Sequence, residues 1–189
     1  ITLPDGSTRP VDAGTPVGAI AAAISPRLAD AALAAWVNDR MVDLTFPLDT
    51  DAAVRIVTNK NPEALELYRH STAHLLAAAV TALFPRTQCG IGPPTDEGFF
   101  YDFVVERPFV PEDLEKIETR MRKIIKEGQK FDRRDITDDA AREELADEPY
   151  KLELIGLKSK AGDAAEGASV EVGEGVLTIY DNLKRDGSV

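Results

Sequence analysis

The sequence predicts an α+β protein with two units, in which a small strand-rich unit precedes a larger unit built on a long helix. Three observations support this prediction. Short β-type segments separated by turn residues fill the first 58 residues, a long helical pattern follows, and the remainder mixes strand-like and helical patterns. The length of 189 residues is enough for one or two domains.

The first unit, residues 1–59, is predicted to contain one helix among short strands. Thr15 and Pro16 start the helix, with Thr15 as its cap, and Ser25-Pro26 ends it. Its apolar face is expected at Val17, Ile20, Ala21 and Ile24. The strands are bounded by turn residues and are expected at residues 1–3, 8–11, 35–37, 41–44 and 53–57. The order of strand, strand, helix and three strands is that of a β-grasp, or ubiquitin-like, fold.

The second unit, residues 60–189, is predicted to begin with a helix from about Pro62 to Phe84. Asn61 is a capping residue, Pro62 takes the first helical position, and Glu63 places an acid near the positive end of the helix dipole. Apolar and small residues continue until Pro85 follows the helix. This helix is therefore expected to be the longest element of the unit.

The rest of the second unit is predicted from capping residues, glycines and apolar periodicity. The expected elements are a turn at Asp96–Gly98, a strand from Phe99 to Val105, a helix from Pro111 to Gly128, a strand near Lys130–Ile136, a helix from Asp138 to Ala146 capped by Thr137, an ordered segment at Tyr150–Leu157, a mobile loop at 158–168 and a β-rich segment at Ser169–Tyr180. The apolar stripe of the helix at Pro111 is expected at Leu114, Ile117, Met121, Ile124 and Ile125.

Composition limits the classes of protein to consider. The formal charge of −11 argues against a general nucleic-acid binder. A basic run between Lys116 and Arg134 is interrupted by acids, which is typical of a solvated helix face with intrahelical ion pairs. No apolar run approaches the length of a bilayer span and no secretory signal opens the chain. The chain begins with Ile1 rather than Met, so we expect a fragment, and its one cysteine suits a reducing cytosol.

His70 and His74 are the two histidines of the chain, and their spacing places both imidazoles on one helix face. Such a pair can bind a metal, hold a water or pass a proton. A zinc site would need further ligands, for which Cys89 and an acid, Asp96 or Glu97, are available. Cys89 also suits a small buried hydrophobe, and the histidines also suit a structural role. The sequence contains no nucleophile motif, so attack by water is the more natural chemistry.

The motifs of the chain resemble a known family. His70-Ser-Thr-Ala-His74-Leu-Leu-Ala, followed by Ile91-Gly-Pro-x4-Gly98-Phe-x-Tyr101-Asp102, resembles the amino-terminal half of bacterial-type threonyl-tRNA synthetase. The first unit is similar to the TGS domain of that family, a β-grasp module, and Val37-Asn-Asp-Arg-Met-Val-Asp-Leu44 resembles its hairpin. The resemblance covers essentially the whole chain.

The resemblance implies that the second unit is an editing domain that hydrolyses mischarged Ser-tRNA(Thr). It implies that His70, His74 and Lys151 are catalytic and that Tyr101 and Gly92 contact the substrate. It further implies a cytoplasmic protein that binds tRNA(Thr), with no membrane partner, and a homodimer at full length. Zinc and ATP are expected only in the aminoacylation domain, which lies outside this chain, and no metal or cofactor is expected here.

Two alternatives to an editing enzyme remain at this point. One is a tRNA-docking module without catalysis, because the first unit has no histidine or cysteine. The other is a zinc hydrolase that uses His70, His74 and Cys89. The family continues with an Asp-x-Cys-Arg-Gly-Pro-His segment that lines the same pocket, and the chain ends at Val189 before it, so the domain is expected to be truncated.

Overall fold

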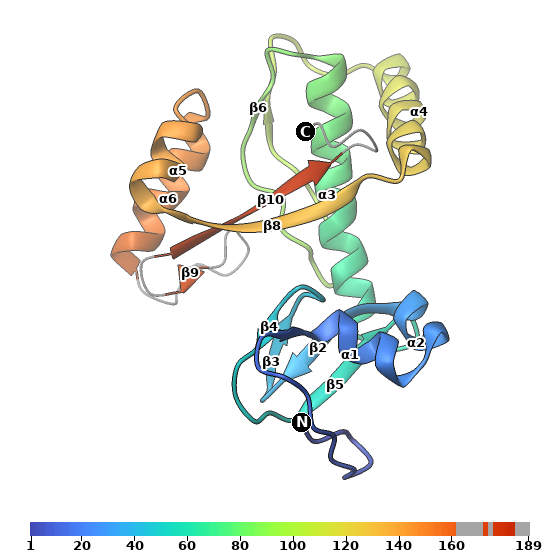
Figure 1. Cartoon of the computed structure of the whole chain (residues 1–189). Coiled ribbons are helices and arrows are strands. Elements are labelled where there is room, and N and C mark those ends of the chain that lie inside the picture. The colour runs from blue at the N-terminus through green and yellow to red at the C-terminus, as the bar shows by residue number, and fades with distance from the viewer. Residues whose placement is uncertain (162–171, 174–175, 184–189) are drawn as a thin grey trace. The chain divides into compact units, whose positions relative to one another are not determined.

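The computed structural model describes residues 1–161, 172–173 and 176–183. The chain forms two compact units, Ile1–Tyr68 and Arg69–Val189 (Figure 1). The division falls within α3 (Ala64–Leu83), whereas the sequence places it before that helix, at residue 59. The two units are described separately below.

Two small sheets and two helices make up the first unit. Strand β2 is central in a three-stranded antiparallel sheet of order β3-β2-β5, and β1 pairs with β4. Thr2 forms a bridge parallel to Ala53. The elements are β1 (Thr15–Pro16), α1 (Val17–Ile24), α2 (Pro26–Ala31), β2 (Ala32–Val37), β3 (Arg40–Val42), β4 (Pro47–Leu48) and β5 (Val54–Thr58).

The core of the first unit lies between α1 and the strands. Val17, Ile20 and Ala21 of α1 are buried, as their helical spacing predicts. Val17 and Ile20 belong to one cluster with apolar residues of the strands and loops, namely Ala35, Val37, Val42, Leu48, Ala52 and Val54. The order of the elements and this core agree with the predicted ubiquitin-like arrangement.

Local hydrogen bonds correct the prediction for the first unit at three places. Thr15 does not cap α1, because it lies in β1 and its hydroxyl donates to the Asp12 carbonyl. The predicted hairpin of residues 1–11 is reduced to a single bridge between Thr2 and Thr8. Helix α2 was not predicted; Ser25 caps it by accepting a hydrogen bond from the Leu28 N–H at 3.1 Å.

The predicted hairpin at Asn38 is confirmed as β2 and β3. Asn38 and Asp39 have φ of 46° and 65°, the left-handed backbone that a two-residue type I′ turn requires. The Asn38 side chain accepts a hydrogen bond from the Ala53 N–H at 2.9 Å, which ties the turn to the residue before β5. The turn is therefore favourable at Asn38 and strained at Asp39, because aspartate tolerates this backbone less well than glycine.

We expect Asp39→Gly to stabilise the first unit by about 0.5 kcal/mol, because relief of left-handed strain outweighs the added freedom of the unfolded chain. The measurement is urea unfolding followed by the fluorescence of Trp36, which lies in β2. Asp39→Val is the contrasting variant and should destabilise the unit, because a β-branched side chain is least compatible with positive φ. Equal midpoints for the parent and both variants would contradict the turn assignment.

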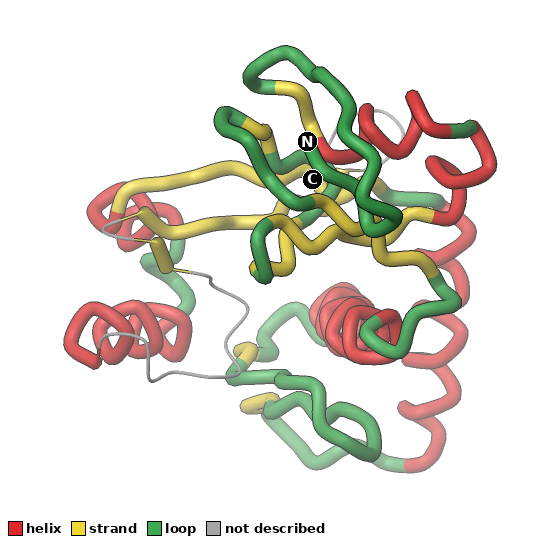
Figure 2. The backbone as a smooth tube through the Cα atoms, turned by 90° about the horizontal axis from the view of Figure 1, so that it is seen from below, coloured by secondary structure: helices red, strands yellow, loops and turns green. Residues whose placement is uncertain are grey.

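The second unit combines two small sheets with four helices or helix segments, among its described residues. A three-stranded antiparallel sheet has the order β8-β10-β9, and β6 pairs with β7. Figure 2 shows β8 and β10 running side by side. After α3 the elements are β6 (Gln88–Cys89), β7 (Phe103–Val104), α4 (Pro111–Glu127), β8 (Lys130–Thr137), α5 (Asp138–Glu144), α6 (Pro149–Ala161), β9 (Val172–Gly173) and β10 (Val176–Leu183).

Helix α3 begins two residues later than predicted. The Asn61 side chain does not cap it; its Oδ1 accepts hydrogen bonds from the N–H and hydroxyl of Thr58, at 2.8 and 3.0 Å. The Glu63 carboxylate is bound by the guanidinium of Arg55 at 2.5 Å and by the indole N–H of Trp36 at 3.2 Å. Polar residues that look like helix-start signals therefore form contacts with β2 and β5 instead.

Helices α3 and α4 lie side by side (Figure 1) and share a buried core that contains Ala79, Val80, Ile117 and Ile124. The predicted start and end of α4 are confirmed. The buried Asp113 carboxylate accepts from Arg107 and from the Val110 N–H, and Gly128 adopts the left-handed backbone with φ of 61°.

The predicted apolar stripe of α4 is too wide. Leu114 and Ile125 are 59% and 64% exposed, whereas Ile117 and Ile124 are buried. Only one side of α4 contacts α3, so the outer members of the stripe lie beyond that contact. The basic run on this helix does form ion pairs within the helix, as predicted, including Arg122 with Glu118 at 2.5 Å.

The end of the second unit is built around β8, β10, α5 and α6. Ala141 of α5, Ile155 of α6 and Leu177 of β10 form a small buried cluster. The Thr137 hydroxyl accepts from the Ala140 N–H and caps α5, as predicted. Helix α6 continues through 158–161, so the mobile loop predicted at 158–168 is wrong for those four residues, and the remainder lies outside the described residues.

Arg134 of β8 joins three elements of this region. Its guanidinium binds Asp181 of β10, with Nε donating at 2.5 Å, and it also binds Glu144 of α5. These two carboxylates raise the pKa of Arg134.

In the described part of the chain, no helix is long and apolar enough to cross a membrane.

Candidate functional site

The two histidines lie together on α3. The rings of His70 and His74 are stacked, with centroids 4.9 Å apart and planes at 27°. Both side chains are partly buried. The i, i+4 spacing thus produces the shared face that the sequence predicts, because residues four apart on a helix lie one above the other.

Gly92 and Tyr101 are in direct contact. A Cβ placed on Gly92 would lie 2.1 Å from Cδ2 and 2.5 Å from Cε2 of the Tyr101 ring. The Tyr101 ring also stacks on Phe103, with centroids 4.8 Å apart. No residue with a side chain fits at Gly92 while the Tyr101 ring keeps this position.

Backbone pairing brings Gly92 and Tyr101 together. The Gly90 N–H donates to the Asp102 carbonyl at 2.8 Å, and the Asp102 N–H donates to the Ile91 carbonyl at 2.9 Å. The predicted turn at Asp96–Gly98 is present, with the Thr95 N–H donating to the Gly98 carbonyl. The strand predicted at 99–105 is confirmed only at β7, because Phe103 and Val104 alone have a ladder partner, in β6.

Cys89 of β6 lies beside the Tyr101 hydroxyl. The Cys89 side chain is 5% exposed, which agrees with the prediction of a small buried hydrophobe. Burial raises the pKa of its thiol, and the negative charge of Glu148 acts in the same direction. Burial also raises the pKa of Tyr101, as do its charge interaction and hydrogen bond with Cys89. Both groups are therefore neutral at physiological pH and serve as hydrogen-bonding surface.

Burial first, and then the positive charges of His70 and Lys151, lower the pKa of His74 to about 4. The charge of Lys151 also acts on Cys89. The structure thus brings together His70, His74, Tyr101 and Lys151 from three segments, with Cys89 among them. His74 is a neutral imidazole at pH 7, able to accept a hydrogen bond.

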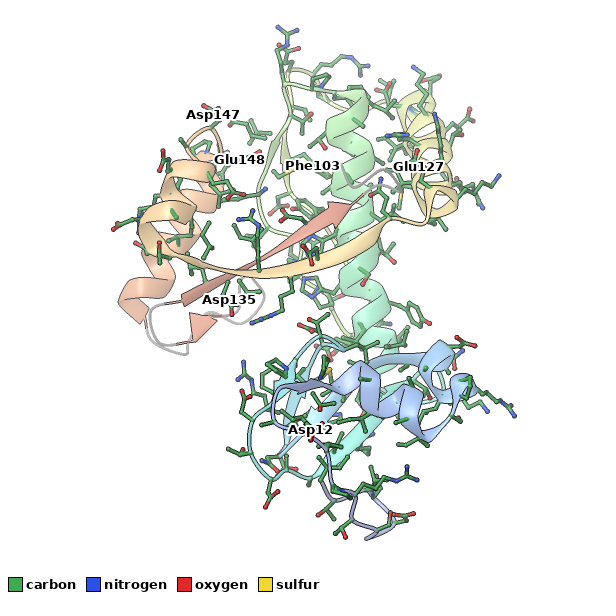
Figure 3. The ribbon with its side chains drawn as sticks, viewed as in Figure 1. Asp12, Phe103, Glu127, Asp135, Asp147 and Glu148 are labelled. Carbon is green, nitrogen blue, oxygen red and sulfur yellow. The ribbon has the colours of Figure 1, made fainter. Side chains whose placement is uncertain are left out.

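Sequence reasoning missed Glu148, which immediately precedes α6. Its charge acts on both Cys89 and Tyr101. Asp147 and Glu148 lie at the amino-terminal end of α6 (Figure 3). The sequence signal that could have indicated Glu148 is its position three residues before Lys151, a spacing at which side chains lie close together at a helix.

Acid is expected to destabilise the protein through His74. The folded-state pKa of His74 is about 4, against 6.5 for the free group. Between these values the unfolded chain binds more protons, so the free energy of unfolding falls as pH falls, by at most about 1.4 kcal/mol per pH unit. The part of the free energy of unfolding that depends on neutral His74 is present in full above pH 6.5 and is lost by about pH 4.

The measurement is chemical unfolding at several pH values between 7 and 4, followed by circular dichroism because Trp36 lies in the first unit. His74→Gln should show a shallower pH dependence than the parent, since glutamine does not titrate. An unchanged slope in the variant would mean that the imidazole titrates normally in the folded protein.

The described residues do not assemble the ligand set of the zinc alternative. No group of three or more His, Cys, Asp or Glu side chains in this part of the chain is placed to hold a metal ion. Asp96 and Glu97, the possible oxygen ligands, are exposed. The arrangement around the histidines is instead one of hydrogen-bonding groups and one lysine.

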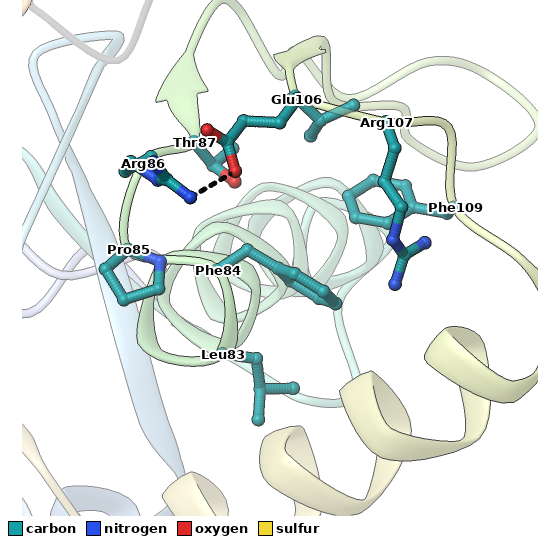
Figure 4. Close-up of a pocket in the computed structure, with 9 residues that line it drawn as sticks. Leu83, Phe84, Pro85, Arg86, Thr87, Glu106, Arg107 and Phe109 are labelled. Atoms are coloured by element: carbon teal, nitrogen blue, oxygen red, sulfur yellow. Dashed lines mark ion pairs between the residues drawn. The ribbon is translucent and has the colours of Figure 1, made fainter.

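A separate cavity of about 240 Å³ lies at the carboxyl-terminal end of α3 (Figure 4). Phe84 and Phe109 line it, and an ion pair between Arg86 and Glu106 at 2.7 Å crosses its rim. None of the candidate site residues borders this cavity. It is therefore distinct from the histidine site.

Comparison with known proteins identifies the first unit and extends into the second. Residues 1–58 match the TGS domain family. A threonine--tRNA ligase from Parafrankia sp. is 58% identical over 151 residues, 80% of this chain and 23% of that protein. The enzyme of the same name from Thermobifida fusca is 53% identical over 178 residues, 94% of this chain and 26% of its own length.

A third relative, the threonine--tRNA ligase of Nocardioides sp., is 55% identical over 163 residues. The chain matches the amino-terminal region of threonine--tRNA ligases. It spans about a quarter of the length of these ligases. Because the matches reach far beyond residue 58, the resemblance includes the histidine-bearing unit as well as the TGS domain.

Proposed function

We propose that the second unit is an editing domain that hydrolyses Ser-tRNA(Thr). The observation that carries the proposal is that the charge of Lys151 acts both on neutral His74, which stacks on His70, and on Cys89, which is hydrogen-bonded to Tyr101. Tyr101 in turn contacts Gly92. A neutral imidazole can hold a water, and a lysine can stabilise an oxyanion. The relation to threonine--tRNA ligases supplies the substrate class.

A threonine-specific ligase has a physical need for such a site. Serine lacks one methyl group of threonine, and a binding pocket discriminates by only about 1–3 kcal/mol for one methylene-sized group. Hydrolysis of the wrong ester in a second site multiplies that discrimination. The editing site must then exclude threonine, whose additional methyl clashes with the site or displaces the attacking water.

In the proposed reaction, water attacks the ester carbonyl and the bond to the terminal ribose oxygen breaks, giving serine and free tRNA. His74 accepts a hydrogen bond from the attacking water and, with His70, positions it. Lys151 stabilises negative charge that develops on the carbonyl oxygen or orients the terminal ribose. Tyr101 shapes the amino-acid pocket, and its ring contacts both Gly92 and Phe103.

The remaining parts of the proposal concern partners. The TGS unit has no histidine or cysteine, and we propose it as a recognition module that helps to bind tRNA(Thr). We assign aminoacylation, which uses zinc and ATP, to a region of the relatives outside the quarter of their length that this chain matches. Dimerisation is likewise proposed for the whole ligase.

The experiment is the hydrolysis of Ser-tRNA(Thr) and Thr-tRNA(Thr) by this chain, beside a chain extended through the Asp-x-Cys-Arg-Gly-Pro-His segment of the family. We expect at least the extended chain to cleave Ser-tRNA(Thr) and to leave Thr-tRNA(Thr) intact. Hydrolysis by neither chain, with tRNA binding intact, would favour the docking module instead.

A further inference from the structure

Glu148 has a buried carboxylate oxygen without a partner. Its Oε2 is inaccessible to solvent and has no hydrogen-bond donor within the described part of the chain. A buried acceptor of this kind is costly, and native proteins retain one where a ligand satisfies it or where it has a chemical task. Among the described residues, Glu63 Oε2 is also buried without a partner, but Glu63 is already bound through its other oxygen by Arg55 and Trp36.

The surroundings of Glu148 are those of the proposed editing site. Its backbone is fixed by hydrogen bonds from its N–H to the Leu145 carbonyl at 2.8 Å and from the Leu152 N–H to its carbonyl at 3.1 Å. Helix α6, which follows it, contacts β6, where Cys89 lies. The charge of Glu148 reaches both Cys89 and the Tyr101 hydroxyl. The backbone of Glu148 is therefore fixed, and its carboxylate lies close enough to Cys89 and Tyr101 for its charge to act on both.

We propose that Glu148 binds the α-ammonium group of the seryl moiety during editing. This inference rests on the proposed function, because it names the contact for one group of that substrate. An aminoacyl ester carries a single cationic group next to its carbonyl, and a buried carboxylate oxygen is the acceptor that matches it. Lys151, three residues later on the same helical face, then lies nearer the carbonyl and the ribose.

A cation of another kind fits the same place less well. A divalent metal would require further anionic or imidazole ligands, and the described residues provide no such group. A neutral hydroxyl could donate to Oε2, but it would leave the charge of the buried carboxylate without a counter-charge. An ammonium also offsets the charge of Glu148 when the pocket closes over a substrate.

The test measures binding, so that it does not depend on catalysis. The probes are two stable amides of 3′-amino-3′-deoxyadenosine, one with serine and one with 2,3-dihydroxypropionic acid, in which a hydroxyl replaces the ammonium. The parent chain should bind the seryl amide about 10- to 100-fold more tightly. Glu148→Gln should bind both amides with nearly equal affinity, because it keeps the shape and loses the charge.

Two further variants keep the test decisive. Glu153→Gln changes an exposed acid on the same helix and should retain the preference of the parent. Glu148→Asp keeps the charge on a shorter side chain and should retain part of the preference if Glu148→Gln does not fold. A preference that survives in Glu148→Gln, or equal or absent binding of the two amides by the parent, would overturn the inference. Preferential binding without any hydrolysis of Ser-tRNA(Thr) would instead count against the proposed function alone.

Discussion

Replacement of Lys151 by methionine is expected to lower the hydrolysis of Ser-tRNA(Thr) about 100-fold. Lys151 supplies a positive charge that acts on both His74 and Cys89. Charge stabilisation of a developing oxyanion by one donor is worth about 10²- to 10³-fold in rate. Methionine keeps most of the length and apolar contact of the side chain, so α6 should keep its place against β6.

The measurement is the single-turnover rate of release of serine from Ser-tRNA(Thr), in the longest form of the chain that is active. Lys126→Met is the matched control, since Lys126 is an exposed lysine on α4. That control should retain the rate of the parent. A Lys151→Met variant with full activity would remove Lys151 from the proposed mechanism and leave the histidines as the remaining candidates.

Gly92→Ala is expected to lower the same rate by about 10- to 100-fold without unfolding the protein. The new methyl group would lie 2.1 Å from a Tyr101 ring atom, so the ring must leave its position. Phe103 restricts the movement of the ring, because the two rings stack with centroids 4.8 Å apart. A displacement of about 1 Å in a positioning group can cost about 10²-fold in rate.

Gly98→Ala is the control for this substitution. Gly98 lies in the turn that follows Gly92, and no heavy atom lies within 4 Å of a Cβ placed on it. Its alanine variant should therefore hydrolyse Ser-tRNA(Thr) like the parent. The ratio of seryl to threonyl ester hydrolysis should fall only in Gly92→Ala. If both variants behave alike, the contact between Gly92 and Tyr101 does not shape the amino-acid pocket.

The elements that depend on local chemistry were predictable from the sequence. The hairpin at Asn38-Asp39 follows from residues that accept positive φ, and the ends of α4 follow from Pro111 and Gly128. The cap of α5 by Thr137 has the same local character. In each case the residues that determine the structure are neighbours in the chain.

The errors occurred where residues with capping chemistry form other contacts instead. Asn61 and Thr15 each have capping chemistry, but the Asn61 side chain binds Thr58 and Thr15 is paired with Leu48 of β4. The apolar stripe of α4 was overestimated because periodicity does not tell how much of a helix face is covered. Leu114 and Ile125 remain exposed because the contact with α3 is narrow.

For the candidate site, the sequence by itself determined that His70 and His74 share a helix face, because that relation depends only on helical geometry. Resemblance to a family added Gly92, Tyr101 and Lys151. The tertiary structure alone placed Lys151 by His74, the Tyr101 ring on Gly92 and the buried oxygen of Glu148 near them. These positions depend on how α6, β6 and α3 come together, and the burial that makes His74 neutral arises from that packing, which no local pattern encodes.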